Sequence, residues 1–519
     1  MYPISIDCAV VRLGHGAQGK RNFRGNLYLT ASVNQEAMTT NEHQQGPIER
    51  TCPAKALSAA VRAEAFPAHP RFPQLKTVSN PKLMLDLFRE HLKPVAGKSV
   101  AIEECVPVRF RWKSDGSRCI LQYALRLLHS DHRSPNEHQT SDVWVTSVLY
   151  AEKGEAENAW SALRAGGSNV AGDLLIFEPV TLIGQFQMVV HAFPFDRLIH
   201  SLPSTLRGPW PELQQRLLPC FGPDCWEIER QLVEPLRYLH EQGAVLRYTV
   251  HARSAAERQT KRFYAKVYRT RHGEQVNKLL QQIHHNLNGA TAKFTVVEPL
   301  FYCSERRCLV LAEAPGRSLQ EILSDSEEGI DSVRPVARAL AAFNQSEVPA
   351  LASHSAQEQL GFLQRAAELL RWARPASTAF IDDVVNEASA RLRDVPHAPI
   401  HWDLKSDHIF LDGEQVIFID LDTVSLGDPA RDPAHLAAHI ACRIDFPEIN
   451  PDRARAAALT LVEEYFAHVP ASWREQFTLQ YAIAALEAAC GLFKRQEPDW
   501  ADRATSAIRE ARAALAGRC

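Results

Sequence analysis

The segment 401–422 gathers most of the side chains that could do chemistry. They are His401, Asp403, Lys405, His408, Asp420 and Asp422. Asp403 stands in a polar loop, HWDLKSDHIF, whereas Asp420 ends an apolar strand, VIFID, that follows a turn at Asp412-Gly413. Two acids at loops beside one short hairpin can face each other across a cleft. Phosphoryl transfer needs this arrangement, because one carboxylate orients the attacking hydroxyl while others hold magnesium over the phosphates.

A lysine on a strand and a glutamate on the next helix meet a second requirement of phosphoryl transfer. Lys266 alternates out of the apolar and aromatic strand FYAKVYR, and Glu274 opens the helix that follows. Such a lysine holds the α- and β-phosphates of a nucleotide, and the glutamate orients the lysine. We therefore expect Lys266 and Glu274 to pair. The alternative for a strand lysine is a solvated charge at a sheet edge.

The loop and the strand together resemble a known family. HWDLKSDHIF followed by VIFIDLDTVSLGDPARDPAHL is similar to the catalytic loop and metal-binding strand of the aminoglycoside phosphotransferase and choline kinase superfamily, relatives of the protein kinases. The resemblance implies that Asp403 is the catalytic base and that Lys405 reaches the transferred phosphate. It implies His408, Asp420 and Asp422 as ligands of Mg²⁺, and His401 as a brace of the loop.

The same resemblance extends to the segment LVLAEAPGRSL, which is similar to the hinge of this family. It implies that backbone groups around Glu313 and Ala314 face the adenine of ATP. The chain departs from the family pattern at His408, where the family has Asn, and an imidazole suits magnesium less well than an oxygen ligand. Neither predicted hairpin carries the glycines that let backbone amides close on phosphate.

Two β-rich regions repeat one order of predicted elements, which indicates an internal duplication. The segment 120–123 of the first region answers 245–248 of the second, and Glu178-Pro179 answers Glu298-Pro299. Ser147 stands in the first region where Lys266 stands in the second, so the first copy lacks the charge that would bind phosphate. After Leu319 apolar residues recur at helical spacing. The sequence thus predicts an α+β, protein-kinase-like, two-lobed fold with a duplicated β-rich N-lobe and a mainly helical C-lobe.

The same patterns predict four parts of the chain. They are a poorly ordered N-terminal extension over 1–75, a degenerate first N-lobe-like domain over 76–205, a nucleotide-binding N-lobe over 206–316 and a helical C-lobe with the catalytic loop and substrate site over 317–519. Met38 lies within the expected extension, so either Met1 or Met38 could be the natural start.

Composition limits the partners of the chain. Its 519 residues carry 58 Lys and Arg against 61 Asp and Glu, a formal charge of -3, which gives no support for bulk binding to nucleic acid or an anionic membrane. No apolar run approaches the ~18 residues of a membrane span, so we expect a cytoplasmic protein. A homodimer through the first N-lobe-like domain is a further expectation.

The expected function is therefore ATP- and Mg²⁺-dependent phosphorylation of a hydroxyl on a small molecule that is similar to an aminoglycoside, choline or a sugar. The alternative is a pseudokinase-like nucleotide-binding or scaffold protein without turnover. In family members with cationic substrates, acids from the C-terminal helices line the pocket. Candidates here are Glu463, Glu464, Glu487 and Asp499, which could equally be solvent-facing helix charges.

Overall fold

The computed structural model describes residues 66–113, 116–129, 139–165, 170, 172–208, 210–287, 293–325 and 327–517. Met38 and most of the predicted extension lie outside these residues. The last part of that extension, however, is folded. Phe66, Phe72 and Leu75 are buried in the main core, so the packed region begins no later than Phe66 rather than after residue 75.

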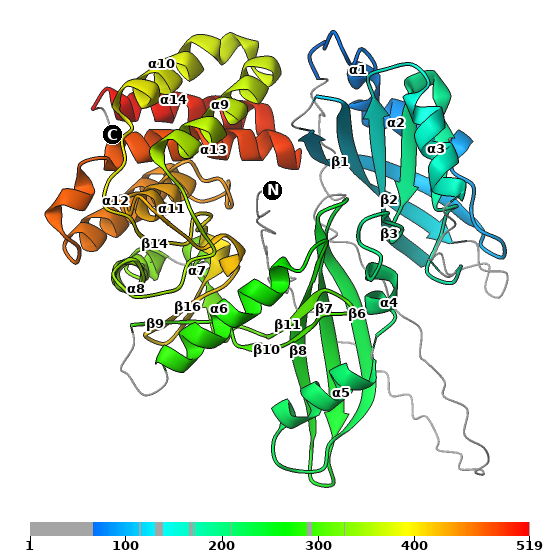
Figure 1. Ribbon diagram of the computed structural model, residues 1–519, viewed down its shortest axis with the longest axis horizontal. Helices are drawn as coiled ribbons and strands as arrows, with labels where there is room; N and C mark the ends of the chain where they lie inside the picture. The colour runs from blue at the N-terminus through cyan, green and yellow to red at the C-terminus, as the bar shows by residue number, and fades with distance from the viewer. Residues whose placement is uncertain are drawn as a thin grey trace, which may run out of the picture.

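A first lobe, residues 66–200, is built on a five-stranded antiparallel sheet (Figure 1). Its strands, in spatial order, are β1 (Val100–Trp112), β2 (Arg118–His129), β3 (Gln139–Tyr150), β5 (Met188–Ala192) and β4 (Val180–Ile183). Helices α1 (Leu75–Val78) and α2 (Pro81–His91) precede the sheet, and α3 (Glu155–Ala165) packs beside β4 and β5. Asn80 caps α2 by accepting from the backbone N–H of Lys82 and Leu83, and Pro81 fits the first helical position.

A second lobe, residues 201–316, repeats this sheet. Its strands, in the same spatial order, are β6 (Glu227–Leu239), β7 (Gly243–Arg253), β8 (Arg258–Tyr268), β11 (Cys308–Ala312) and β10 (Pro299–Cys303). Helix α6 (His272–Leu287) follows the third strand, as α3 does in the first lobe, while α4 (Leu202–Leu206) and α5 (Pro211–Leu217) connect the lobes. The repeated order of elements that the sequence predicts is thus confirmed.

The first strand of each sheet also bends at the same place. Pairing with the neighbouring strand shifts between Pro107 and Arg109 in β1, and between Pro235 and Arg237 in β6. A shift of this kind is a β-bulge, which re-aims the side chains that follow it. Each bulge thus precedes an arginine near the end of the first strand, Arg109 opposite Gln122 in the first sheet and Arg237 opposite Val245 in the second.

The helical lobe, residues 317–517, confirms the helices expected after Leu319. They are α7 (Leu319–Asp325), α8 (Val333–Asn344), α9 (Ala356–Ala373), α10 (Thr378–Arg391), α11 (Arg431–Ala441), α12 (Pro451–Phe466), α13 (Phe477–Arg495) and α14 (Trp500–Leu515). The apolar helix α13 is central and packs against α9, α11 and α14. Ser355 and Glu358 form a capping box at the start of α9.

Short strands complete the helical lobe and join it to the second lobe. The hairpin of β15 (Ile409–Asp412) and β16 (Gln415–Phe418) is flanked by β12 (Arg317–Ser318) and by β9 (Phe294–Val296), which pairs in parallel with β16. A second small sheet contains β13 (Ala352–Ser353), β17 (Ser425–Gly427) and β14 (Ala398–Ile400). Because β9 belongs to the second lobe, its pairing with β16 places β8 close to the segment that follows β16.

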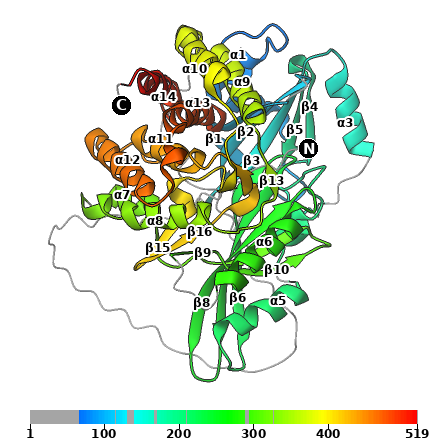
Figure 2. The ribbon, with the colours of Figure 1, turned by 60° about the vertical axis from the view of Figure 1, so that its left-hand side comes forward.

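The first lobe lies beside the helical lobe of the same chain (Figures 1 and 2), and aromatic rings pack between the two. Phe110 of β1 lies 5.2 Å from Phe493 of α13 and 5.8 Å from Trp372 of α9, measured between ring centroids. Phe66 adds contacts of 5.2 Å to Phe110 and Phe493. Such pairs bury large apolar areas, so the first lobe is fixed over the helices.

Among the residues that the structure describes, no helix has both the length and the apolar character that crossing a membrane requires.

Candidate active site

Lys266 lies buried between the second lobe and the helical lobe, where it contacts two carboxylates. Its Nζ donates to the side chains of Asp420 and Asp422, which follow β16. Tyr268, two residues further along β8 and therefore on the same face of the sheet, donates its hydroxyl to Asp422 Oδ1 at 2.6 Å. The structure thus brings together Lys266 and Asp420, the residues that the sequence analysis assigns to the phosphates and to the metal.

The pKa values of the two carboxylates are shifted in opposite directions. Burial raises the pKa of Asp420. Burial also opposes ionisation of Asp422, but the charge of Lys266 and the hydrogen bonds to this carboxylate outweigh it and lower its pKa to about 2. Asp422 is therefore the carboxylate that pairs most firmly with the lysine. Its two oxygens are held by Lys266 and Tyr268, so it would have to leave both to bind a metal.

The loop that carries Asp403 is held by an acid at the start of α11. The backbone N–H groups of His401 and Trp402 donate to Asp432 at 2.7 and 3.0 Å. Trp402 has a φ of +74°, in the left-handed region that non-glycine residues rarely adopt, and these bonds hold it there. His401 Nε2 lies 2.9 Å from the carbonyl of Ile419. Burial lowers the pKa of His401 to about 4, so a neutral imidazole donates this bond and braces the loop against the strand that leads to Asp420.

The Asp403 side chain is 18% exposed, which leaves it within reach of a substrate. Lys405 Nζ donates to its Oδ2 at 2.9 Å, and His435 Nε2 lies 3.9 Å from its Oδ1. An ionised, partly exposed carboxylate can orient a hydroxyl and accept its proton. The structure therefore brings the two predicted catalytic residues, Asp403 and Lys405, into direct contact.

His408 occupies the position of the expected metal-ligating Asn. Its Nδ1 lies 2.9 Å from the backbone carbonyl of Asp403, which fixes the ring. Among the described residues its Nε2 has no hydrogen-bond partner, and this atom faces Asp420 Oδ2 at 3.6 Å. Donation from Nδ1–H leaves a lone pair on Nε2, so this nitrogen and the carboxylate oxygen form a two-donor site that fits a divalent cation.

Within the described part of the chain no group of three or more His, Cys, Asp or Glu side chains is placed to hold a metal. A cation at His408 and Asp420 would thus take its remaining ligands from phosphate oxygens and water, which is usual for magnesium in nucleotide sites. The donor set fits a divalent cation, with one nitrogen ligand in place of an oxygen ligand.

A narrow apolar slot adjoins Lys266 and Asp420. Its other lining residues are Tyr264, Val297, Leu311, Ala312, Glu313, Ala314, Phe410 and Ile419. The predicted hinge residues Glu313 and Ala314 thus lie in one wall with Lys266. The free volume is about 30 Å³, which is room for one or two water molecules. A nucleotide base could enter only after the walls move apart.

Gly316 ends this hinge at a φ of +80°. A Cβ there would lie 2.0 Å from the carbonyl oxygen of Leu411 in β15. Glycine is required because the chain passes over the hairpin in close contact with its backbone.

The structure does not bring Glu274 to Lys266. Glu274 is 39% exposed and pairs with Lys278 on its own helix at 3.0 Å, and this pairing lowers its pKa. The buried face of α6 contains Val276, Leu279, Leu280 and Ile283. Glu274 precedes Val276 by two residues, about 200° around the helix, and so points away from the sheet. The expected lysine–glutamate pair is replaced by the pairs of Lys266 with Asp420 and Asp422.

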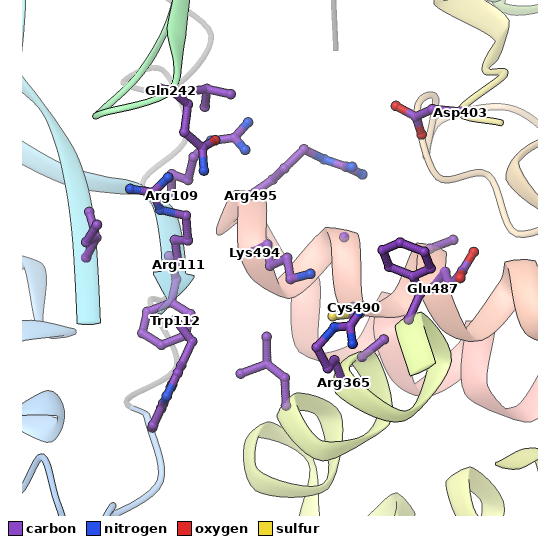
Figure 3. Close-up of a pocket in the computed structure, with 18 of the residues that line it drawn as sticks. Arg109, Arg111, Trp112, Gln242, Arg365, Asp403, Glu487, Cys490, Lys494 and Arg495 are labelled. Atoms are coloured by element: carbon purple, nitrogen blue, oxygen red, sulfur yellow. The ribbon is translucent and has the colours of Figure 1, made fainter. Parts of the chain in front are cut away.

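A much larger cavity, of about 880 Å³, lies on the other side of Asp403 (Figure 3). The first lobe, the end of β6 with the turn that follows it, the catalytic loop and helices α9, α11 and α13 all contribute to its walls. Of the four acids considered for a substrate pocket, only Glu487 is among the described residues that line this cavity, and it pairs with Arg431 at 3.0 Å. Glu464 instead pairs with Arg334 and Arg338.

Sequence reasoning missed the arginines of the cavity wall, among them Arg109, Arg111 and Arg237. A signal was present: Pro-x-Arg occurs at 107–109 and again at 235–237, on equivalent strands of the two sheets.

Residues 248–475 match the model of a family described as "Phosphotransferase enzyme family". No curated protein matches the chain. Solved structures with a similar fold include a protein from Ralstonia eutropha JMP134 that is described as a candidate aminoglycoside phosphotransferase. The match has a TM-score of 0.41 and 14% identity, and it covers 60% of this chain and 99% of that one. Another is choline kinase LicA from Streptococcus pneumoniae, with a TM-score of 0.38 and 13% identity over 58% of this chain and 98% of that one. Likeness at this distance identifies no substrate.

Proposed function

Because residues 248–475 match the model of the phosphotransferase enzyme family, we propose that this chain is an ATP-dependent kinase that phosphorylates a hydroxyl of a small molecule. The observation that carries the proposal is the position of Asp403. Its carboxylate lines the 880 Å³ cavity, while Lys266 and Asp420 line the apolar slot on the other side of the same loop. A substrate and a nucleotide could therefore meet across this loop.

Each residue has a distinct part in the proposed reaction. Asp403 orients the substrate hydroxyl and accepts its proton as the oxygen attacks the γ-phosphorus, while the bond to the β-phosphate breaks and ADP leaves. Lys266 binds the α- and β-phosphates once it leaves the carboxylates, and Lys405 stabilises charge on the transferred group. His408 Nε2 and Asp420 would hold a divalent cation, which supplies positive charge to the phosphates when it is bound. Asp422 keeps Lys266 and Tyr268 in place in the state without nucleotide.

Specific observations favour a second candidate, a nucleotide-binding or scaffold protein without turnover. Lys266 pairs with two carboxylates, the slot has a volume of about 30 Å³, and His408 replaces the family Asn. In that case nucleotide binding would not depend on a metal and Asp403 would have no chemical role.

Replacement of Asp403 decides between the two. We expect Asp403→Asn to lower transfer of label from radiolabelled ATP into a protein-free small-molecule extract by at least about a hundredfold, the usual effect of losing a general base. Asp412→Asn, at the exposed hairpin turn, is the matched control and should retain transfer. Equal transfer by wild type and Asp403→Asn would remove the catalytic assignment.

A further inference from the structure

Among the charged side chains that line the cavity beside Asp403, cations predominate. Nine of its lining residues are arginine or lysine, whereas three are aspartate or glutamate. Two of the three acids are already paired, Glu487 with Arg431 and Asp403 with Lys405. We propose that this cavity binds a hydroxyl compound that already carries an oxyanion, a phosphate or a carboxylate; the proposal rests on the kinase function above and names its class of substrate.

The packing of Arg431 shows that the cationic wall is an ordered part of the structure rather than a chance grouping of surface charges. Its side chain is 5% exposed and stacks on Trp402, with the guanidinium carbon 3.7 Å from the ring centroid. One nitrogen, Nη2, donates to Glu487 at 3.0 Å. Its Nε and Nη1 are buried and have no hydrogen-bond partner among the described residues. Buried donors without a partner are costly, so two orphaned guanidinium N–H sites in a cavity wall indicate a ligand that accepts from them.

The first lobe supplies the opposite wall. Arg109, Arg111 and Trp112 project from the end of β1 toward the cavity, across from Arg365 of α9 and Lys494 and Arg495 of α13 (Figure 3). Arg111 is fixed by donation from Nη2 to the carbonyl of His240 at 2.9 Å. Burial lowers the pKa of Arg111 to about 10, which still leaves it charged at neutral pH. The first lobe thus contributes cations to the substrate side.

The basic cavity and the apolar slot are separate. None of the described residues lines both. The arginines are therefore not the groups that would surround the adenine, and their partner is a second ligand. The guanidinium group of an arginine binds phosphate or carboxylate through two parallel N–H donors. These charge-assisted hydrogen bonds are stronger where water is excluded from the wall.

The positive charge of this cavity disfavours a cationic substrate. An ammonium group placed among these arginines would lose its hydration and gain repulsion from their like charges. The wall would therefore discriminate against amino sugars and quaternary amines, which fit an acidic pocket. Asp403 lines the same cavity and accepts from Lys405, so it is placed to orient the hydroxyl while the arginines bind the anion.

A set of ligands on one sugar scaffold tests the inference by binding alone. Glucose 6-phosphate, glucuronate, glucose and glucosamine are compared by thermal shift in the presence of Mg²⁺ and the ATP analogue AMP-PNP, at constant ionic strength. Three proteins are used: wild type, the double variant Arg109→Gln with Arg365→Gln, and a control double variant Arg164→Gln with Arg207→Gln. Both control arginines are exposed and lie outside the cavity.

We expect the anionic sugars to stabilise the wild type most and glucosamine least, with the phosphate and carboxylate members showing which oxyanion is preferred. The Arg109/Arg365 variant should bind the preferred anion at least about tenfold more weakly, while the control variant binds as wild type does. Stabilisation by glucosamine equal to or above that by the anionic sugars would overturn the inference, as would equal anion binding by all three proteins. If AMP-PNP stabilised none of the three proteins, the result would count against the nucleotide function and not against the anion site. The two are separable because the ranking of the sugars measures binding and does not depend on turnover.

Discussion

Lys266 and Asp420 lie 154 positions apart in the chain, yet they form a buried ion pair where the second lobe meets the helical lobe. Both side chains lie in the wall of the apolar slot. The lysine that would bind phosphate thus pairs with a carboxylate that would bind the metal when neither ligand is present. This pair would have to separate before phosphate and cation could bind to the same atoms.

Loss of the lysine alone should therefore destabilise the fold. Lys266→Met leaves Asp420 and Asp422 buried without their cation, and breaking such a pair costs about 3–5 kcal/mol of unfolding free energy. Adding Asp422→Asn should restore part of the loss, because one buried charge is then removed. Urea denaturation measures both variants. Lys278→Met, an exposed lysine of α6, is the control and should change stability by less than about 0.5 kcal/mol. A loss below about 1 kcal/mol for Lys266→Met would contradict the pairing.

The metal preference should follow from His408. Imidazole suits manganese better than magnesium, which prefers oxygen ligands. We expect AMP-PNP to stabilise the wild type more with Mn²⁺ than with Mg²⁺, and His408→Asn to shift the preference toward Mg²⁺. Identical metal dependence in the two proteins, followed by thermal shift, would show that His408 does not touch the cation.

Stability should fall in mild acid because histidines are buried in the neutral form. Burial lowers the pKa of His401 to about 4 and that of His240 to about 3, both from 6.5. The unfolded chain takes up these protons near pH 6.5 and the folded chain does not. The free energy of unfolding is therefore highest above pH 6.5. As the pH falls from 6.5 toward the pKa in the folded state, it decreases by up to about 1.4 kcal/mol per pH unit for each histidine.

Urea unfolding from about pH 7.5 down to about pH 5.5 measures this slope. His240→Gln should make it shallower, whereas His251→Gln, at a more exposed site, should not. The account of the buried histidines would be wrong if stability were flat over this range.

The aromatic contact between the first lobe and the helices should contribute strongly to stability. Phe110→Ala removes a ring with 1% exposure that touches Phe66, Trp372 and Phe493, and should cost about 3–5 kcal/mol. Chemical denaturation and the near-ultraviolet signal of Trp372 report the change. A cost below about 1 kcal/mol would mean that the first lobe is held elsewhere.

Local patterns in the sequence predicted much of this structure. The two matching sheets and the helices after Leu319 follow from strand alternation and helical spacing, whereas the contact of Lys266 with Asp420 was not predicted, because the motifs paired this lysine with Glu274. The position of Glu274 could also have been predicted, because Val276, Leu279 and Ile283 define the buried face of α6 and leave Glu274 outside it.

The remaining features depend on how the lobes dock. Nothing local shows that the end of β1 faces α13, so the repeated Pro-x-Arg could mark Arg109 but could not place it in a cavity with Asp403. Burial of Phe66 and Phe72 depends in the same way on a surface that other parts of the chain provide, which is why this stretch resembled a disordered tail. The expected homodimer through the first lobe stays a prediction, and the face that carries Phe110 is already covered by the helices of the same chain.

The most direct test of the central claim is a thermal-shift titration with ATP, with and without Mg²⁺ or Mn²⁺, on wild type and on Lys266→Met combined with Asp422→Asn. Binding to the folded state raises its apparent stability. We predict a metal-dependent rise for the wild type that is lost in the double variant. No rise at millimolar ATP, or an equal rise in both proteins, would contradict the assignment of Lys266 to a nucleotide site and favour the scaffold protein.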